Sequence, residues 1–258
     1  MRSTRLLNII ESSDSMLIKR VALVTGGSKG LGKAIVKKLY DEGYNVAFTY
    51  FNSEDEAVQI CEGKDDNIFA IKSDASSFTE AFNVIEKVIN KFSKIDVIIN
   101  NAAAAKDNPI WKISEKDWDF TMEHVLKPSF NYAKAVVEHF IENKYGKVIN
   151  IGSINGLRGR EGSIAYSTAK AALVGFTKTL AKELGKYNIN VNLVAPGYIE
   201  TEGQSNTSEL IKKMVLDECY IKVLTAPEEV ANLVYFLASE YSNNITGQIY
   251  KIDCGQYI

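Results

Sequence analysis

The chain has few cysteines and few histidines, and their spacing excludes two classes of site. Cys61, Cys219 and Cys254 are widely spaced, and an odd number of cysteines cannot all pair within one chain. This pattern indicates reduced thiols in a cytoplasmic protein and not a disulfide scaffold. His124 and His139 have no metal-ligand spacing, so we expect no metal site.

The chain also lacks long apolar runs and a strong net charge, which bears on whether it binds membranes or nucleic acid. No apolar run approaches the roughly 20 residues of a membrane span, and the first 15 residues carry arginines without the apolar core of a signal peptide. A net charge of -2 gives no electrostatic attraction to nucleic acid or to an anionic membrane, so we expect neither as a partner. We interpret residues 1–18 as a flexible N-terminal extension and residues 19–258 as one domain.

Short apolar runs alternate with helical patterns from residue 20 to the end of the chain. Continuous Val- and Ile-rich runs are typical of parallel strands that are covered on both faces. We expect strands at 20–25, 45–50, 68–71, 95–99, 147–151, 190–194 and 248–252. The expected helices are 31–42, 55–62, 77–92, 115–142 with a kink at Pro128, 163–185 and 227–239. The pattern predicts an α/β fold: one Rossmann-type, doubly wound parallel sheet of about seven strands with helices on both faces.

A glycine-rich loop directly follows the first expected strand and opens the first expected helix. Glycines there permit a tight turn and a close backbone approach, and the helix N-terminus offers N–H groups to phosphate, so we expect a dinucleotide. The second strand ends at residues 49–53 without the carboxylate that favours NAD, and Lys29 can meet a 2′-phosphate. We therefore predict NADP(H) in preference to NAD(H). The loop comprises Gly26, Gly27, Ser28, Lys29, Gly30, Leu31 and Gly32.

A second informative stretch, residues 153–170, contains Ser153, Tyr166 and Lys170. Tyr166 and Lys170 are four residues apart on an expected helix and therefore share one face. A phenol is a weak acid with a pKa of about 10, and a neighbouring ammonium lowers that pKa because it favours the phenolate. With Ser153 holding the substrate oxygen, the three side chains form a metal-free proton-transfer site for a carbonyl or an alcohol.

From about residue 19 onward the chain resembles the short-chain dehydrogenase/reductase family. Residues 25–32 match its glycine-rich loop, 100–103 its NNAG motif and 196–201 its PG-x-x-x-T segment, while Ser153, Tyr166 and Lys170 match its catalytic positions. The resemblance implies a homotetramer, or failing that a homodimer, that pairs helices 115–142 and 163–185. Beyond the loop it implies cofactor contacts from Phe51, Asp74, Ala75, Asn101, Tyr166, Lys170, Pro196, Gly197, Ile199 and Thr201.

Within that family the chain is most similar to the 3-oxoacyl-carrier-protein reductases, on residues 106–108, 194–201, 227–231 and 245–248. This implies an oxidoreductase that reduces a ketone, in the first place a 3-oxoacyl thioester of fatty-acid biosynthesis. A dehydrogenase of a sugar, steroid or small cyclic alcohol stays open. The family's catalytic asparagine is replaced by Val125, with His124 before it, so a nucleotide-binding sensor with weak turnover also stays open. We expect residues 202–220 to cover the substrate.

Overall fold

The computed structural model describes residues 19–64, 66–200 and 209–258, so the expected extension and Thr201 lie outside the described residues. Within them seven parallel strands form one sheet in the order β3-β2-β1-β4-β5-β6-β7. The order reverses between β1 and β4, as in other doubly wound sheets, and the predicted fold class is confirmed. The strands are β1 (Val21–Val24), β2 (Asn45–Tyr50), β3 (Ile68–Lys72), β4 (Val97–Asn100), β5 (Gly146–Ile151), β6 (Ile189–Pro196) and β7 (Ile249–Ile252).

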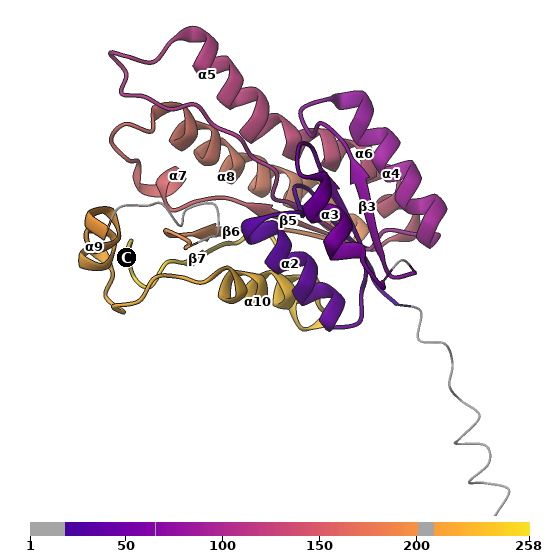
Figure 1. The fold of residues 1–258 in the computed structure, drawn as a ribbon. Coiled ribbons are helices and arrows are strands. Elements are labelled where there is room, and N and C mark those ends of the chain that lie inside the picture. Colours follow the sequence, from indigo (N-terminus) through magenta and orange to yellow (C-terminus); the bar gives the residue numbers. More distant parts are fainter. Residues whose placement is uncertain (1–18, 65, 201–208) are drawn as a thin grey trace, which may run out of the picture.

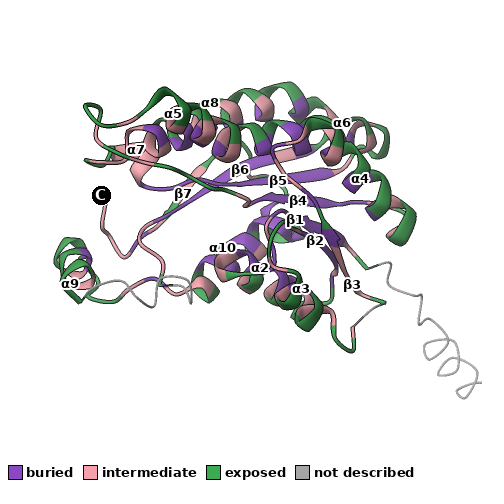
Figure 2. Cartoon of the chain, turned by 45° about the horizontal axis from the view of Figure 1, so that its top comes forward, coloured by how far each residue is buried: buried purple, intermediate pink, exposed green. Residues whose placement is uncertain are grey.

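Helices cover both faces of the sheet (Figure 1). On one face lie α2 (Gly30–Asp41), α3 (Glu54–Cys61) and α10 (Pro227–Ala238), and on the other α4 (Phe78–Phe92), α6 (Lys127–Asn143) and α8 (Ile164–Leu184). The strands between the two helical layers are buried (Figure 2), which explains their continuous Val and Ile runs. Short helical turns, η2 (Gly185–Tyr187) and η4 (Glu240–Ser242), follow α8 and α10.

The carboxyl ends of all seven strands lie along one edge of the sheet because the strands are parallel. β1 pairs with β2 and β4, and β5 pairs with β4 and β6. The loops that follow these strands therefore meet at that edge, where open α/β sheets bind their ligands. Besides α8 and α10, the connections after β5 and β6 contain the shorter helices α7 (Asn155–Arg158) and α9 (Glu209–Glu218).

The expected helix 115–142 is divided, whereas the other predicted bounds agree with the structure within about two residues. A π-helical turn, η1 (Met122–Leu126), separates α5 (Glu115–Thr121) from α6. Pro128 lies in the first turn of α6, so the interruption precedes the proline and is not centred on it. Proline has no N–H for the carbonyl four residues earlier, that of His124. That oxygen accepts instead from the Ala104 N–H at 3.2 Å and anchors the loop after β4.

Candidate active site

The glycine-rich loop forms one wall of a cavity at the carboxyl ends of β1, β2 and β3. Gly30 begins α2 with a φ of 51°, a conformation that favours glycine, and a Cβ at Gly32 would overlap the Gly26 carbonyl oxygen. Asn101, after β4, fixes the loop because its amide donates to the carbonyls of Thr25 and Gly26, both at 3.0 Å. The loop therefore has the close backbone packing that the glycine spacing predicts.

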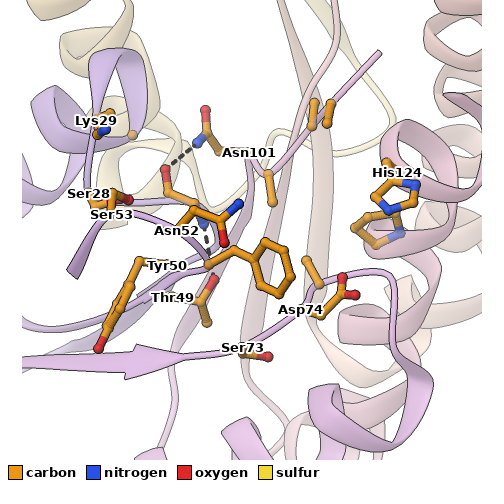
Figure 3. A pocket seen from close by; sticks show the side chains of 18 of the residues that line it. Ser28, Lys29, Thr49, Tyr50, Asn52, Ser53, Ser73, Asp74, Asn101 and His124 are labelled. Atoms are coloured by element: carbon orange, nitrogen blue, oxygen red, sulfur yellow. Dashed lines mark hydrogen bonds between the residues drawn. The ribbon is translucent and has the colours of Figure 1, made fainter. Parts of the chain in front are cut away.

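This first cavity has a volume of about 490 Å³ and is lined by the loops after β1 to β4 (Figure 3). Two residues of the glycine-rich loop do not line it, since Gly27 packs toward Phe48 and Val36, and Gly30 lies at the start of α2. The predicted cofactor residues Tyr166, Lys170, Pro196, Gly197 and Ile199 do not line it either. The predicted residues that do line it are Gly26, Ser28, Lys29, Leu31, Gly32, Phe51, Asp74, Ala75 and Asn101. Residues that the motifs did not single out for this cavity are Ser73, Ser76, Ala104, His124 and Pro128.

The charged groups of the first cavity are few. Among its described lining residues Asp74 is the only carboxylate, and its Oδ1 accepts from the N–H and the hydroxyl of Ser76 at 2.9 and 2.8 Å. Lys29 pairs with Glu56, with Nζ 2.8 Å from a carboxylate oxygen. The hydrogen bond from Lys29 holds the pKa of Glu56 below its ordinary value. A cation therefore stands at the mouth of the cavity, and an exposed partner neutralises it.

Ser153 and Tyr166 line a second cavity of about 590 Å³, together with Gly197 and Ile199 after β6. Pro196, the last residue of β6, is buried behind them. The outer wall consists of α7, α9 and the C-terminal residues, held together by one polar cluster. In this cluster Arg158 donates to Glu218 at 2.9 Å and to the Gln256 carbonyl at 3.3 Å, and Gln256 Nε2 donates to Glu218 at 2.7 Å.

The structure brings Ser153, Tyr166 and Lys170 together where α8 passes the end of β5. Burial raises the pKa of Tyr166, and a hydrogen bond with the Ser153 side chain opposes this effect. Lys170 Nζ donates to the Ile151 carbonyl at 2.6 Å and lies 5.7 Å from the centre of the Tyr166 ring. Burial lowers the pKa of Lys170 to about 8. The Tyr166 pKa thus shifts opposite to the direction that the four-residue spacing predicts, because desolvation disfavours the phenolate.

Asp107, which no local pattern marks as part of the site, holds the helix that carries Tyr166. Its Oδ1 accepts from the N–H groups of Ala165 and Tyr166 at 3.1 and 3.2 Å. These are two of the donors that the start of α8 leaves without an intrahelical partner. The Asp107 charge also raises the pKa of Tyr166. One carboxylate therefore both positions the tyrosine and favours its protonated form.

Val125, which replaces the family's asparagine, is 1% exposed within η1 and offers no polar side-chain atom. His124 does not take its place beside Tyr166, because its ring lines the first cavity and not the second. The His124 ring stacks on Phe120 with centres 4.0 Å apart, and its Nδ1 lies 2.8 Å from the Phe120 carbonyl oxygen. His124 is therefore a wall of the nucleotide cavity.

Among the residues that the structure describes, no three His, Cys, Asp or Glu side chains gather where they could hold a metal ion. No helix among those residues is long and apolar enough to span a membrane. The doubly wound sheet, the cavity beside its glycine-rich loop and the cluster of Ser153, Tyr166 and Lys170 together are those of an oxidoreductase.

Comparison with known proteins identifies the family. The family model named short chain dehydrogenase matches residues 20–211. The 3-oxoacyl-[acyl-carrier-protein] reductase FabG of Staphylococcus epidermidis is 36% identical over 93% of this chain and 100% of that protein. FabG of Thermotoga maritima is 36% identical over 93% of this chain and 98% of that protein. A mutant short-chain dehydrogenase/reductase from Serratia marcescens superposes with a TM-score of 0.85 at 32% identity, over 92% of this chain and 97% of that one. The chain belongs to the short-chain dehydrogenase family.

Members of this family bind a nicotinamide cofactor, and the residues of the first cavity fit one. Gly32 lets the loop pack closely on the start of α2, because a Cβ there would overlap the Gly26 carbonyl oxygen, and the backbone at the start of α2 borders the cavity as a phosphate site requires. Asp74, after β3, and Asn101, after β4, add polar groups. Thr201, predicted to contact the cofactor, lies outside the described residues.

Proposed function

We propose that the chain is an NADP(H)-dependent reductase that converts the ketone of a 3-oxoacyl thioester into an alcohol. The observation that carries this proposal is the hydrogen-bonded pair of Ser153 and Tyr166 on the wall of the second cavity. Relatives named 3-oxoacyl-[acyl-carrier-protein] reductase, 34–36% identical over nearly their whole length, support the thioester as substrate class.

In this proposal each polar side chain has one task, and the bound nicotinamide supplies the hydride. The Tyr166 hydroxyl donates its proton to the substrate oxygen, and burial keeps it protonated at neutral pH because its pKa is raised. Ser153 donates a hydrogen bond to the same oxygen. The ammonium of Lys170, on the inner side of the Tyr166 ring, stabilises the phenolate that remains after proton transfer.

The test of the reaction is NADPH oxidation with acetoacetyl-CoA by the native chain and by Tyr166→Phe. We expect turnover in the native chain and a loss of at least about a hundredfold in the variant, which is the usual contribution of a general acid. Tyr187→Phe, at a tyrosine outside both cavities, is the matched control. Unchanged turnover in Tyr166→Phe would contradict the assigned role of the tyrosine.

The proposed preference for NADP(H) depends on Lys29, the cation at the mouth of the first cavity. In Lys29→Ala we expect kcat/KM for NADPH to fall about tenfold, as the loss of one partly exposed charged contact predicts, with little change for NADH. Lys37→Ala on the same helix α2, which removes an exposed ion pair with Asp41, is the control. A parallel loss with both cofactors would refute a contact with the 2′-phosphate.

Val125 supports a second candidate, a nucleotide-binding sensor with little turnover. The two candidates differ in Val125→Asn. If the chain is an active reductase, burying an amide here removes about 1–3 kcal/mol of stability and brings no gain in activity. If the native chain binds NADPH without turnover and Val125→Asn reduces ketones, the sensor interpretation holds. Binding of NADPH without turnover in either protein directs the search to sugars, steroids and cyclic alcohols.

We also propose that the chain is a cytoplasmic homotetramer. Ala171, Ala172 and Gly175 are exposed on α8, and a Cβ at Gly175 would meet no atom within 4 Å. Small exposed side chains let a helix of a second copy approach closely. Light scattering on the purified full chain measures the number of copies, and a monomer at micromolar concentration would contradict the proposal.

A further inference from the structure

Two of the three cysteines lie close together on the outer wall of the second cavity. Cys219 directly follows α9 and is 3% exposed, and Cys254 follows β7 by two residues and is half-buried. The N–H groups of Tyr220 and Ile221 both donate to the Cys254 carbonyl oxygen, each at 3.0 Å. These two bonds join the end of α9 to the C-terminal residues. Cys61, the third cysteine, ends α3.

The same bonds set the separation of the two cysteines. In a trans peptide the Cα of Cys219 lies on the same side as the Tyr220 N–H, so it is about 4 Å from the Cys254 carbonyl oxygen. The Cα of Cys254 lies about 2.4 Å from that oxygen. The two Cα atoms are therefore at most about 6.5 Å apart, and disulfides usually join Cα atoms about 4.4–6.8 Å apart.

The Cys254 side chain lies near Cys219 and can rotate. After burial, which is the largest effect, the Cys254 thiol itself contributes to the raised pKa of Cys219, so the two sulfurs lie within electrostatic reach. The Cys254 Sγ now lies 3.5 Å from the Thr225 hydroxyl, and rotation about its Cα–Cβ bond turns it away from Thr225. Cys254 also has a φ of 54°, a conformation that favours glycine over any residue with a Cβ.

We propose that Cys219 and Cys254 form a reversible disulfide by exchange with a low-molecular-weight disulfide such as oxidised glutathione. The Cys254 thiolate attacks one sulfur of the oxidant, whose S–S bond breaks, and one glutathione leaves as a thiol. Cys219 then gives up its proton and attacks the Cys254 sulfur, and the second glutathione leaves as a thiol. The protein loses two electrons and two protons, and the oxidant gains both.

The disulfide would hold the wall of the substrate cavity in place. It joins the end of α9 to the C-terminal residues beside the contacts among Arg158, Glu218 and Gln256, which line that cavity. We expect a higher melting temperature in the oxidised chain, because a cross-link restricts the unfolded state. We also expect kcat/KM for acetoacetyl-CoA to fall about two- to tenfold, since α9 can no longer shift to admit the thioester. Only this activity readout rests on the proposed function.

The experiment treats the full chain with oxidised glutathione, blocks the remaining thiols with N-ethylmaleimide and maps the peptides without reduction. The expected result is a peptide cross-linked through Cys219 and Cys254, and two fewer cysteines modified by N-ethylmaleimide than in the untreated chain. The melting temperature should rise, and dithiothreitol should reverse the rise. Cys61→Ser should behave as the native chain does. Cys219→Ser should stop at a glutathione adduct on Cys254.

Cys254→Gly keeps the experiment decisive, because glycine suits the positive φ and the variant retains the backbone bonds to Tyr220 and Ile221. It should form no cross-link and should melt at the same temperature with and without oxidant. Glutathione adducts without a cross-link, or a cross-link through Cys61, would overturn the proposal. If no ketone is turned over at all, the peptide map and the melting temperatures still decide it independently of the proposed function.

Discussion

Replacing Asp107 by alanine and by asparagine separates its two effects on the active site. Alanine removes the acceptor of the Ala165 and Tyr166 N–H groups, and asparagine keeps an oxygen but removes the charge. A helix-capping acceptor contributes about 1 kcal/mol, and a negative charge at a helix N-terminus about 0.3–1 kcal/mol. We therefore expect a loss of about 1–2 kcal/mol for alanine and about 0.5 kcal/mol for asparagine. For a chain of this size the melting temperature falls by about 2–8 °C and 1–2 °C, respectively.

The pH dependence of activity tests the charge of Asp107 separately. This charge raises the pKa of Tyr166, so both variants have a lower Tyr166 pKa than the native chain. Ketone reduction needs the protonated tyrosine and is lost as the pH rises through that pKa. Both variants should therefore lose kcat/KM for acetoacetyl-CoA at a lower pH than the native chain does. Alanine should also lower kcat about tenfold at every pH, since Tyr166 is no longer held.

Asp119→Asn, an exposed aspartate on α5, is the control for the change of charge. The assays are calorimetry for the melting temperature and NADPH oxidation between about pH 7 and 11 for the profile, a range that includes the ordinary phenol pKa of about 10. A pH profile of Asp107→Asn that coincides with the native profile would refute the electrostatic effect. An unchanged melting temperature in Asp107→Ala would refute the cap.

Three other predictions concern the nucleotide cavity, a buried lysine and association. Gly32→Ala puts a Cβ against the Gly26 carbonyl, so titration of NADPH fluorescence should show binding weaker by at least about a hundredfold, with Gly185→Ala unaffected. Burial lowers the pKa of Lys147 from 10.5 to about 8, so the unfolded chain binds more protons between these values and the free energy of unfolding rises with pH there. Lys147→Met should remove a part of this rise on the order of 1–3 kcal/mol, measured by urea unfolding at about pH 7.5 and 9.5, and an unchanged slope would contradict it. Ala172→Arg places a charge on the exposed face of α8, so light scattering should find fewer copies per particle than in the native chain.

The fold could be predicted from the sequence because its signals are local and repeated. The inner strands are buried on both faces and therefore consist largely of continuous apolar residues, and each covering helix has an apolar face such as that of Ile35, Val36 and Leu39. The glycine-rich loop could be placed for the same reason. Gly30 has a φ of 51°, and Gly32 has no room for a Cβ. Both positions therefore favour glycine, and this restriction is visible in the sequence.

The contacts that adjust the site could not be predicted in this way. Asp107 meets the start of α8 from 58 residues earlier in the chain, and Arg158 reaches Glu218 across 60 residues. No spacing rule relates such pairs, because their distance depends on how the whole sheet orders its loops. The spacing of Tyr166 and Lys170 could not predict the raised pKa of Tyr166 for a similar reason. The spacing shows that the two share a helix face, but the Ile151 carbonyl holds the ammonium and burial dominates the phenol.

The π-helical turn η1 before α6 anchors the loop after β4, and this loop in turn contacts α8, the helix that carries Tyr166. Pro128 leaves the His124 carbonyl without its helical donor, and this oxygen takes the Ala104 N–H of the loop after β4. Farther along the same loop, the Thr121 hydroxyl donates to the Lys106 carbonyl at 2.9 Å and accepts from the Lys106 N–H at 3.0 Å.

The next residue in that loop, Asp107, caps α8 and so positions Tyr166. Two anchors, Thr121 at the end of α5 and the His124 carbonyl within η1, therefore fix the loop that holds the tyrosine. Neither anchor uses the side chain at position 125, which is buried and apolar. In this chain the placement of Tyr166 is thus independent of the asparagine that the family usually has there, and only a proton path that needs that amide is affected by Val125.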